Sequence, residues 1–219
     1  DLHYPLRRQR QMCIRDRVHG DCSVRIRPMS DPLAPVRVAD TRVETIHVMT
    51  PNDANFLGKV FGGHILSLID LVAYAVSSKF AGVLCVTASF DRVDFHSPIE
   101  VGNLVKMVGH VSYVGRTSLE VSVDISAEDV IAKTVHQTNT ARVTMVALRD
   151  GKPTPVPRLI CETRDEHIQF LEGQLRREFR GRAQGDLQRM MERLRSLPDS
   201  ELHSMVRTEL ESHRPRSSS

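Results

Sequence analysis

One segment of the 219-residue chain constrains its fold more than any other, because residues 64–80 are apolar nearly all round a helix. With the closing Ala81-Gly82 the segment has about 19 residues, and a helix of that length is roughly 28 Å long. A helix without a polar face must be surrounded by other structure. Gly82 follows it and suits the left-handed conformation that commonly ends a helix. The sequence therefore predicts one long, central, buried helix.

The segments around this helix alternate between apolar and polar residues, which is typical of β-strands. A strand is predicted over residues 41–49, and a series of strands is predicted over residues 83–148. Turns are expected at Gly115-Arg116, at residues 129–133 and at Asp150-Gly151. This order indicates an α+β fold in which an antiparallel sheet curls around the helix. One sheet covers only part of a helix, so we expect a second chain to cover the rest.

Three regions are expected along the chain. Residues 1–39 are predicted to be an irregular tail, residues 40–160 the α+β domain, and residues 161–219 a charged helical extension. Apolar stripes in the extension fit three helical stretches, at residues 168–179, 187–194 and 202–210, and are expected to pack on the core or on a neighbouring subunit.

The charge distribution argues against a nucleic-acid partner. The net charge is +3, and the excess lies in residues 1–39, which carry eight arginines against four acidic residues. The remainder lacks the basic surface that nucleic-acid binders present.

Several other classes of protein are also disfavoured. The four cysteines (Cys13, Cys22, Cys85, Cys161) form no CxxC pair, so neither a disulfide framework nor a structural zinc is expected, and a cytoplasmic location fits best. No segment is expected to span a membrane or to act as a secretory signal. The ten histidines form no short metal-binding pair, so no metal site is expected. The chain contains no GxSxG, Walker or GxGxxG motif.

Asp70 is the exception within the apolar helix, since it stands between Ile69 and Leu71. An ionised carboxylate in such a place loses hydration unless it meets water, hydrogen-bond donors or a cation. Two interpretations stay open: a structural acid bonded to its neighbours, or a catalytic acid or base.

The start of the helix has features that could bind a substrate. Asn55 lies in the preceding loop, where its side chain could simply shape a turn. Gly62 and Gly63 could give a tight entry to the helix, or expose unpaired amides that favour a developing oxyanion. Gly62 and Asp70 are eight residues apart, about 12 Å along a helix. If both act on one substrate, a second chain must bring its Asp70 beside Gly62.

These residues resemble a known family. The stretches Pro51–Gly63 and Ser67–Asp70 are similar to the signature of hotdog-fold acyl-CoA thioesterases, the group of the bacterial YciA-type enzymes and the brain-type acyl-CoA hydrolases. Residues 94–102 and 114–121 resemble the next two landmarks of that family. The resemblance covers roughly residues 41–158.

The resemblance implies a sheet wrapped around one helix and a tight dimer, often assembled as a trimer of dimers. The implied activity is hydrolysis of acyl-CoA thioesters to free fatty acid and coenzyme A, which is part of the substrate and product, with no separate cofactor. Asn55 and Asp70 match the catalytic pair of the family, which is contributed across the dimer interface. Gly62, with Gly63 beside it, matches the glycine that polarises the thioester carbonyl.

Further residues match substrate-binding positions. The segment Arg116-Thr117-Ser118 matches a stretch near the coenzyme A moiety, where Arg116 suits a phosphate, although a turn arginine is by default a surface charge. His64 stands where the family has Trp or Thr, and is expected either in the acyl channel or as an ordinary core or interface histidine.

Two alternatives remain. A non-catalytic hotdog module could bind acyl-CoA and regulate another process, which the presence of Asn55 and Asp70 disfavours. A hotdog dehydratase would need a His paired with a carboxylate near the helix, but His64 and Asp70 are six residues apart and lie on different helix faces.

Overall fold

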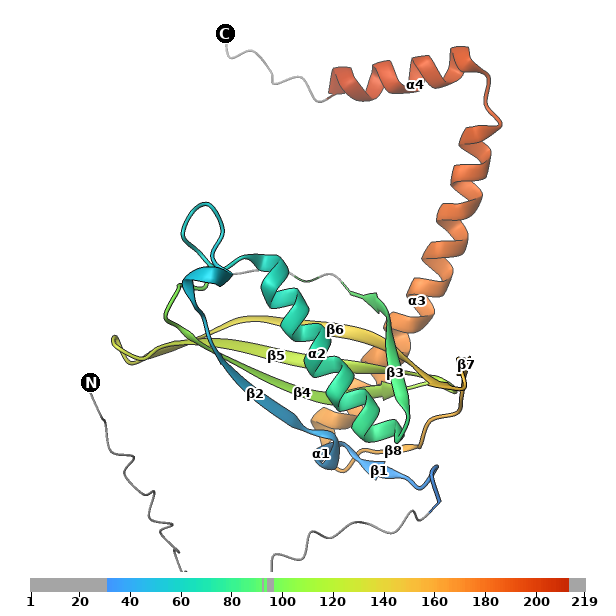
Figure 1. Cartoon of the computed structure of the whole chain (residues 1–219). Coiled ribbons are helices and arrows are strands. Elements are labelled where there is room, and N and C mark those ends of the chain that lie inside the picture. The colour runs from blue at the N-terminus through green and yellow to red at the C-terminus, as the bar shows by residue number, and fades with distance from the viewer. Residues whose placement is uncertain (1–30, 92, 94–96, 213–219) are drawn as a thin grey trace, which may run out of the picture. The chain divides into compact units, whose positions relative to one another are not determined.

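The computed structural model describes residues 31–91, 93 and 97–212 (Figure 1). Cys13, Cys22 and residues 94–96 of the family resemblance therefore lie outside the described residues. The elements are, in order, β1 (Val36–Arg37), α1 (Val38–Thr41), β2 (Val43–Val48), the 3-10 helix η1 (Pro51–Asp53), α2 (Gly62–Ala81), β3 (Leu84–Phe90), β4 (Leu104–Val114), β5 (Ser118–Asp129), β6 (Thr134–Arg149), β7 (Lys152–Pro153), β8 (Leu159–Ile160), α3 (Arg164–Arg195) and α4 (Asp199–Ser212).

A curved antiparallel sheet with α2 across one face forms the centre of the fold (Figure 1). The strand order is β2-β4-β5-β6-β3, and β7 pairs with β6. The register shifts within three of the strand pairs, β3 with β6, β4 with β5 and β5 with β6. Such bulges bend and twist strands, which helps the sheet to curl around a helix. The predicted α+β fold, a sheet wrapped around one long helix, is confirmed.

Helix α2 buries one long stripe of side chains against the sheet: Ile65, Leu68, Ile69, Val72, Ala73, Val76, Ser77, Phe80 and Ala81. Gly109 of β4 lets the helix approach closely, because a Cβ there would lie 2.7 Å from Val72 Cγ1. Gly82 ends the helix with φ +65°, and its N–H donates to the Ser78 carbonyl at 2.9 Å. The predicted position of the helix end is confirmed.

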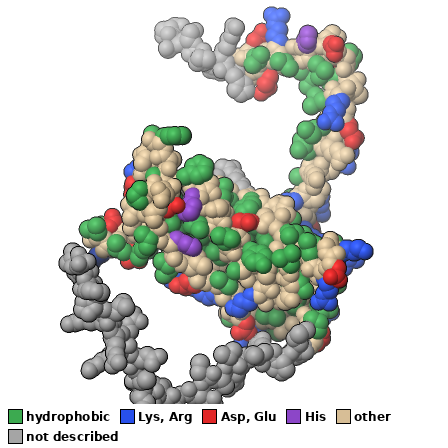
Figure 2. Space-filling model, in the orientation of Figure 1, with side chains coloured by type: hydrophobic (Ala, Val, Ile, Leu, Met, Phe, Trp, Pro, Cys, Tyr) green, Lys and Arg blue, Asp and Glu red, His purple; other side chains and the backbone are tan. Residues whose placement is uncertain are grey.

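The opposite side of α2 is not covered within one chain. Leu71 is 61% exposed and Tyr74 is 44% exposed. β3 is an edge strand of the sheet. Figure 2 shows hydrophobic side chains on the face where α2 and β3 lie. The expectation of a helix surrounded on every side is therefore met on one side only, as expected if a second chain covers the other.

Within the described residues, α2 is also the one helix long and apolar enough to cross a membrane. The sequence analysis expects no membrane-spanning segment, and length and composition alone do not make α2 one. Half of the most apolar stretch of α2 is buried inside the protein. The core helix of a globular domain is apolar because it is buried, so its composition resembles that of a membrane-spanning helix.

Two short elements precede residue 43, where an irregular tail was expected. β1 pairs in parallel with β8, and the backbone N–H of Val111 donates to Thr41 Oγ1 at 3.0 Å. The partners of these elements lie about seventy to more than a hundred residues further along the chain, so no local sequence pattern indicated them.

Helix α3 packs on the face of the sheet opposite α2 (Figure 1). The first two predicted helical stretches form this single helix, which begins with a capping box between Thr163 and Glu166. Its apolar stripe, expected to pack, is exposed: Ile168, Leu171, Leu175 and Phe179. The contacts to the sheet are made mainly by polar residues.

Three contacts define how α3 sits on the sheet. His110 Nε2 lies 2.9 Å from Gln169 Oε1, and the Tyr113 and Phe170 ring centroids are 5.0 Å apart. Arg176 Nη2 donates to Glu120 Oε1 at 2.7 Å. Packing of the apolar stripe on the core, the first of the two expected positions, was wrong because the sheet presents Glu120 and His110 on this face. Packing on a neighbouring subunit stays a prediction.

Candidate active site

A tight loop between η1 and α2 positions the first group of candidate residues. Thr50 and Asp53 form a capping box, and the N–H of Phe61 donates to the Asp53 carbonyl at 2.7 Å. Asn55 Oδ1 accepts hydrogen bonds from the N–H groups of Leu57 at 2.9 Å and Lys59 at 3.2 Å. Asn55 therefore shapes the turn with its oxygen.

The side-chain nitrogen of Asn55, unlike its side-chain oxygen, is available to a ligand. Asn55 Nδ2 makes no hydrogen bond within the described part of the chain, and Asn55 lines two neighbouring cavities of about 890 and 360 Å³. The turn-forming role and an Nδ2 donor free for a ligand are thus compatible in one side chain.

Gly62 and Gly63 form the first turn of α2. The first N–H groups of a helix have no partner within it, and neither of these two amides bonds to a carbonyl among the described residues. A Cβ at Gly63 would lie 2.3 Å from the Phe61 ring, so a side chain there would displace Phe61. Gly62 lines the smaller cavity and Gly63 the larger one.

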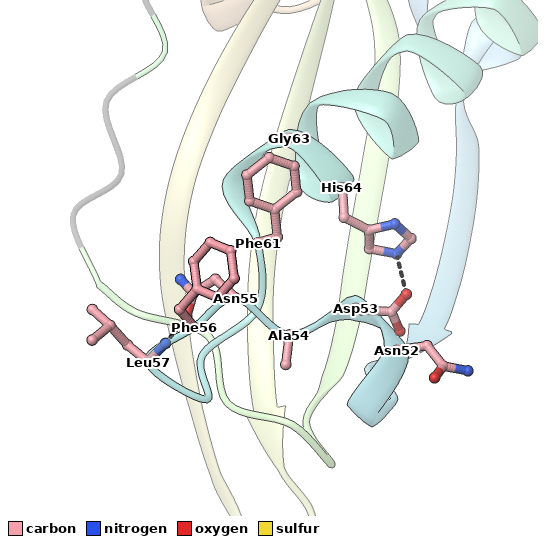
Figure 3. Close-up of a pocket in the computed structure, with 9 residues that line it drawn as sticks. All are labelled: Asn52, Asp53, Ala54, Asn55, Phe56, Leu57, Phe61, Gly63 and His64. Carbon is pink, nitrogen blue, oxygen red and sulfur yellow. Dashed lines mark hydrogen bonds and ion pairs between the residues drawn. The ribbon is translucent and has the colours of Figure 1, made fainter.

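His64 faces the larger cavity and is held by an acidic residue (Figure 3). His64 Nε2 lies 3.3 Å from Asp53 Oδ1, while Phe56 and Phe61 lie on the other side of the cavity. Hydrogen bonds from the Thr50 side chain and then its backbone lower the pKa of Asp53, and His64 lowers it further. The cavity thus has an aromatic wall and a polar wall.

Asp70 lies two turns along α2, half-buried on the side that the chain leaves uncovered. Thr87 of β3 donates a hydrogen bond through Oγ1 to Asp70 Oδ1 at 2.5 Å. The sequence analysis missed Thr87. Apolar and polar residues alternate along this strand, and Thr87 occupies one of the polar positions, which normally face solvent. Asp70 lines neither cavity at the start of α2.

Gly115, Arg116 and Thr117 form the tight turn between β4 and β5, and Ser118 is the first residue of β5. The N–H of Gly115 donates to the Ser118 carbonyl at 2.7 Å, which confirms the predicted turn. The register aligns Leu119 of β5 with Met145 of β6, and Met145 with Thr87 of β3. Neighbouring strands are about 4.8 Å apart, so Thr87 and the start of β5 are about 10 Å apart.

Within one chain, the candidate residues thus fall into two groups. Asn55, Gly62, Gly63 and His64 come together at the start of α2. Asp70 and the 116–118 turn lie toward another part of the sheet, through Thr87 and the register of β3, β6 and β5. The eight-residue spacing from Gly62 to Asp70 keeps the two groups about 12 Å apart along the helix.

Metal ligands do not gather in the described ranges. Across residues 31–91, 93 and 97–212 there is no group of three or more His, Cys, Asp or Glu side chains that could hold a metal ion.

Comparisons with known proteins agree with this fold and loop. The thioesterase superfamily matches residues 57–134. Protein VdlD of Helicobacter pylori is 39% identical over 138 residues, which cover 63% of this chain and 79% of that protein. The chain therefore belongs to the thioesterase superfamily.

Two solved structures are similar over the same region. An apo-hexameric acyl-CoA thioesterase is 34% identical with a TM-score of 0.66, covering 68% of this chain and 97% of that one. An acyl-CoA hydrolase from Staphylococcus aureus, in complex with butyryl coenzyme A and coenzyme A, is 32% identical with a TM-score of 0.66, covering 74% and 99%.

The Staphylococcus aureus enzyme has also been solved with single alanine substitutions at three polar residues. They are an asparagine, an aspartate 15 residues later and a threonine 17 residues after the aspartate. Asn55, Asp70 and Thr87 are separated by the same 15 and 17 residues.

Proposed function

We propose that this protein hydrolyses acyl-CoA thioesters to free fatty acid and coenzyme A, at a composite site made by two copies of the chain. The observation that carries the proposal is the position of Asp70. Its carboxylate is held by Thr87 on the uncovered side of an otherwise apolar helix. A buried structural acid would need no open face, whereas an acid that acts on a substrate does.

The uncovered face supports the proposed homodimer. Leu71 and Tyr74 of α2 are exposed, and β3 is a free sheet edge; exposed apolar side chains and unpaired strand edges both mark surfaces that another chain can cover. A two-fold axis that sets two α2 helices antiparallel would bring Asp70 of the partner subunit beside Gly62. Assembly of three such dimers is part of the proposal, supported by the hexameric relative.

The proposed mechanism uses groups from both chains. The unpaired amides of Gly62 and Gly63 polarise the thioester carbonyl, and such an oxyanion donor contributes roughly 3 to 4 kcal/mol. The partner's Asp70 acts as general base on water, or as a nucleophile that forms an anhydride. Asn55 orients the water or the carbonyl through Nδ2. No cofactor or metal takes part.

The matching spacing of the Staphylococcus aureus substitutions supports these roles for Asn55 and Asp70. It adds Thr87 as a positioning residue, because its hydroxyl fixes one oxygen of the Asp70 carboxylate. Arg116, Thr117 and Ser118 are proposed to lie near coenzyme A, and His64 to line the acyl channel. The free thiols of Cys85 and Cys161 fit the reducing cytoplasm as the proposed location.

The alternative of a non-catalytic acyl-CoA-binding module gives a different result in one assay. Purified protein would bind acyl-CoA tightly without releasing a thiol, whereas the proposed enzyme releases coenzyme A from acetyl-CoA, butyryl-CoA or palmitoyl-CoA. Thiol release at background rate over this series would contradict the proposed hydrolysis.

Replacing Asp70 tests the catalytic group. Asp70→Asn keeps the size of the side chain and a hydrogen-bond acceptor for Thr87, but removes the base or nucleophile. We expect turnover to fall by about 10² to 10⁴-fold, the range of a general base. Asp124→Asn, on the outer sheet face beside Thr140, is the matched control and should keep full activity. Full activity of Asp70→Asn would remove Asp70 from the mechanism.

Subunit mixing tests the composite site. Asn55→Asp keeps the oxygen that accepts from Leu57 and Lys59 but loses the Nδ2 donor. Each variant alone should be inactive, and a mixture of Asp70→Asn and Asn55→Asp subunits should regain one working site per mixed dimer. Confirmed subunit exchange without recovery would contradict a shared site.

Single-turnover hydrolysis in labelled water would separate the two proposed roles of Asp70, general base and nucleophile, because only the anhydride route puts label into its carboxylate.

A further inference from the structure

The turn between β4 and β5 lies against helix α3 at one particular residue. A Cβ at Gly115 would lie only 2.6 Å from Arg177 Nη1, so the guanidinium group of Arg177 rests over the bare backbone of the turn. Beside this contact is a surface hollow of about 430 Å³, lined by Tyr113, Gln174, Arg177, Glu178, Gly181 and Arg182. Arg177 therefore joins the C-terminal helix to the turn that contains Arg116.

Arg177 differs in charge environment from its neighbours on α3. Arg176 bonds to Glu120, and Arg180 bonds to Asp91. Arg177 Nη1 donates to the neutral hydroxyl of Tyr113 at 3.2 Å. Among the described residues, no carboxylate pairs with Arg177 or with Arg116. Arg177, which contacts Gly115, and Arg116, the next residue in the turn, thus both keep positive charge without a carboxylate partner among the described residues.

The remaining charged residues of the hollow do not cancel the positive charge of Arg177 and Arg116. Glu178 Oε2 lies 4.0 Å from Arg182 Nη2, so these two lining residues offset each other. The flanking pairs of Arg176 and Arg180 fix the rotation of α3 and hold Arg177 in place over the turn. A fixed guanidinium with free N–H donors is the group that proteins use to bind phosphate in a two-pronged manner.

We propose that Arg177, together with Arg116, binds a phosphate of the coenzyme A nucleotide, and that the hollow on α3 receives this end of the substrate. The inference rests on the proposed function. Acyl-CoA carries its phosphates at the far end of the pantetheine chain, so they must bind away from the reacting carbon. The turn satisfies this, because it lies about 10 Å across the sheet from Thr87, which holds Asp70. Arg177 lies outside every motif of the family resemblance.

The test compares three thioesters with one acyl group. Butyryl-CoA carries the 3′-phosphate and the diphosphate, butyryl-dephospho-CoA carries the diphosphate alone, and S-butyryl-pantetheine carries neither. For Arg177→Gln we expect KM for butyryl-CoA to rise about 10- to 100-fold, the effect of losing a hydrogen bond to a charged group, with a much smaller change in kcat. The rise should be absent for S-butyryl-pantetheine.

The dephospho substrate separates the two sources of phosphate. If Arg177 binds the 3′-phosphate, the variant and the wild type have similar KM for butyryl-dephospho-CoA. If it binds the diphosphate, the rise persists with that substrate. Arg177→Lys keeps the charge but loses the two-pronged geometry, and should give an intermediate KM. Arg193→Gln, an exposed residue further along α3, is the matched control and should match the wild type.

An unchanged KM for butyryl-CoA in Arg177→Gln, or an equal rise with S-butyryl-pantetheine, would overturn the inference. Failure of the proposed function has a different signature, since the wild type would then release no thiol from any of the three compounds. In that case calorimetric titration of coenzyme A into wild type and Arg177→Gln decides the inference, which requires about 10-fold or greater weakening in the variant and fails with equal affinity.

Discussion

Helices α2 and α3 pack on opposite faces of one sheet by different physical means. α2 contributes a continuous apolar stripe that fits between the side chains of the strands, with Gly109 leaving room for Val72. α3 leaves its apolar stripe exposed and is held by the pairs Arg176–Glu120 and Arg180–Asp91. The free energy of the first contact comes mainly from burial, whereas the second depends on directional polar contacts.

The difference explains where chemistry can occur. A close-packed apolar contact leaves no room for a charged group, so any polar function of α2 must lie on its uncovered side, as Asp70 does. The polar contacts of α3 do not maximise burial, but they fix its rotation about its own axis. Arg177 is thereby placed over the β4–β5 turn.

The largest expected effect concerns the buried pair under α3. The Glu120 side chain is only 2% exposed, and it also accepts a hydrogen bond from Ser112 Oγ at 2.9 Å. Arg176→Leu leaves this carboxylate buried without its cation, and we expect a loss of about 3 kcal/mol in the free energy of unfolding. Urea denaturation followed by circular dichroism measures it.

Two companion variants decide whether the pair or the packing matters. Arg189→Leu, on the exposed part of α3, should leave stability nearly unchanged. Adding Glu120→Gln to Arg176→Leu should recover part of the loss, because the unpaired charge is gone. Equal stability of Arg176→Leu and wild type would show that α3 does not depend on this ion pair, and the contrast with α2 would fail.

On the α2 side, the next effect concerns turnover rather than stability. Thr87→Val removes the hydroxyl that fixes Asp70 while keeping the shape of the side chain. We expect kcat/KM for butyryl-CoA to fall about 10- to 100-fold, since a hydrogen bond to a charged group contributes roughly 1.5 to 3 kcal/mol. Thr87→Ser keeps the hydroxyl and should stay near wild type. A fall in Thr87→Ser as large as in Thr87→Val would assign Thr87 to packing instead.

The contrast between the helices also separates what the sequence could predict. The position of α2, its end at Gly82 and the strands that follow were predicted, because apolar periodicity records burial directly. The apolar stripe of α3 does not pack on the core of its own chain, one of the two positions expected for it, because Glu120 and His110 form the surface that receives this helix. The pairing of β1 with β8 has no local signal at all.

The residues of the candidate site likewise fall into those that the sequence indicated and those that it did not. Asp70 was conspicuous because it breaks an apolar pattern, and Asn55 and Gly62 were conspicuous because a loop precedes the helix. Thr87 and Arg177 are ordinary members of their strand and helix, and only the three-dimensional contacts with Asp70 and Gly115 distinguish them. The sequence therefore indicated groups that violate a local rule, but not groups that act through a partner.

Two glycine substitutions sharpen the comparison further. A Cβ at Gly109 would lie within 3 Å of Val72 and Val76 across the α2 contact, and one at Gly173 would lie 2.4 Å from Tyr113 Cβ across the α3 contact. Overpacking of a tight contact commonly destabilises by roughly 1 to 3 kcal/mol. We expect Gly109→Ala to lower both stability and turnover, because it moves the helix that carries Asp70.

For Gly173→Ala, in contrast, we expect a loss of stability and a higher KM for butyryl-CoA, with little change in kcat, because only α3 is displaced. Gly181→Ala on the same helix has open space around its Cβ and should not destabilise the protein. Chemical denaturation and steady-state kinetics of the three variants provide the measurements. A lower kcat in Gly173→Ala, as large as in Gly109→Ala, would mean that the two faces of the sheet are not independent.

The smallest effect concerns the polar anchor before α2, where a carboxylate supports the helix that is otherwise held by apolar contacts. The hydrogen bonds from Thr50 lower the pKa of Asp53 below its ordinary 3.8, so folding favours the ionised form. The contribution of Asp53 to stability is therefore fully present above that ordinary pKa and is lost as the pH falls through the lower pKa of the folded protein.

Asp53→Asn should lower the Tm slightly at pH 7, and the difference in Tm from wild type should shrink below about pH 4. His64→Gln, which removes the ring paired with Asp53 but leaves the capping box intact, should show a smaller Tm change at pH 7. A Tm difference for Asp53→Asn that grows on acidification would reverse the sign of this linkage and show that the anchor does not depend on the ionised carboxylate.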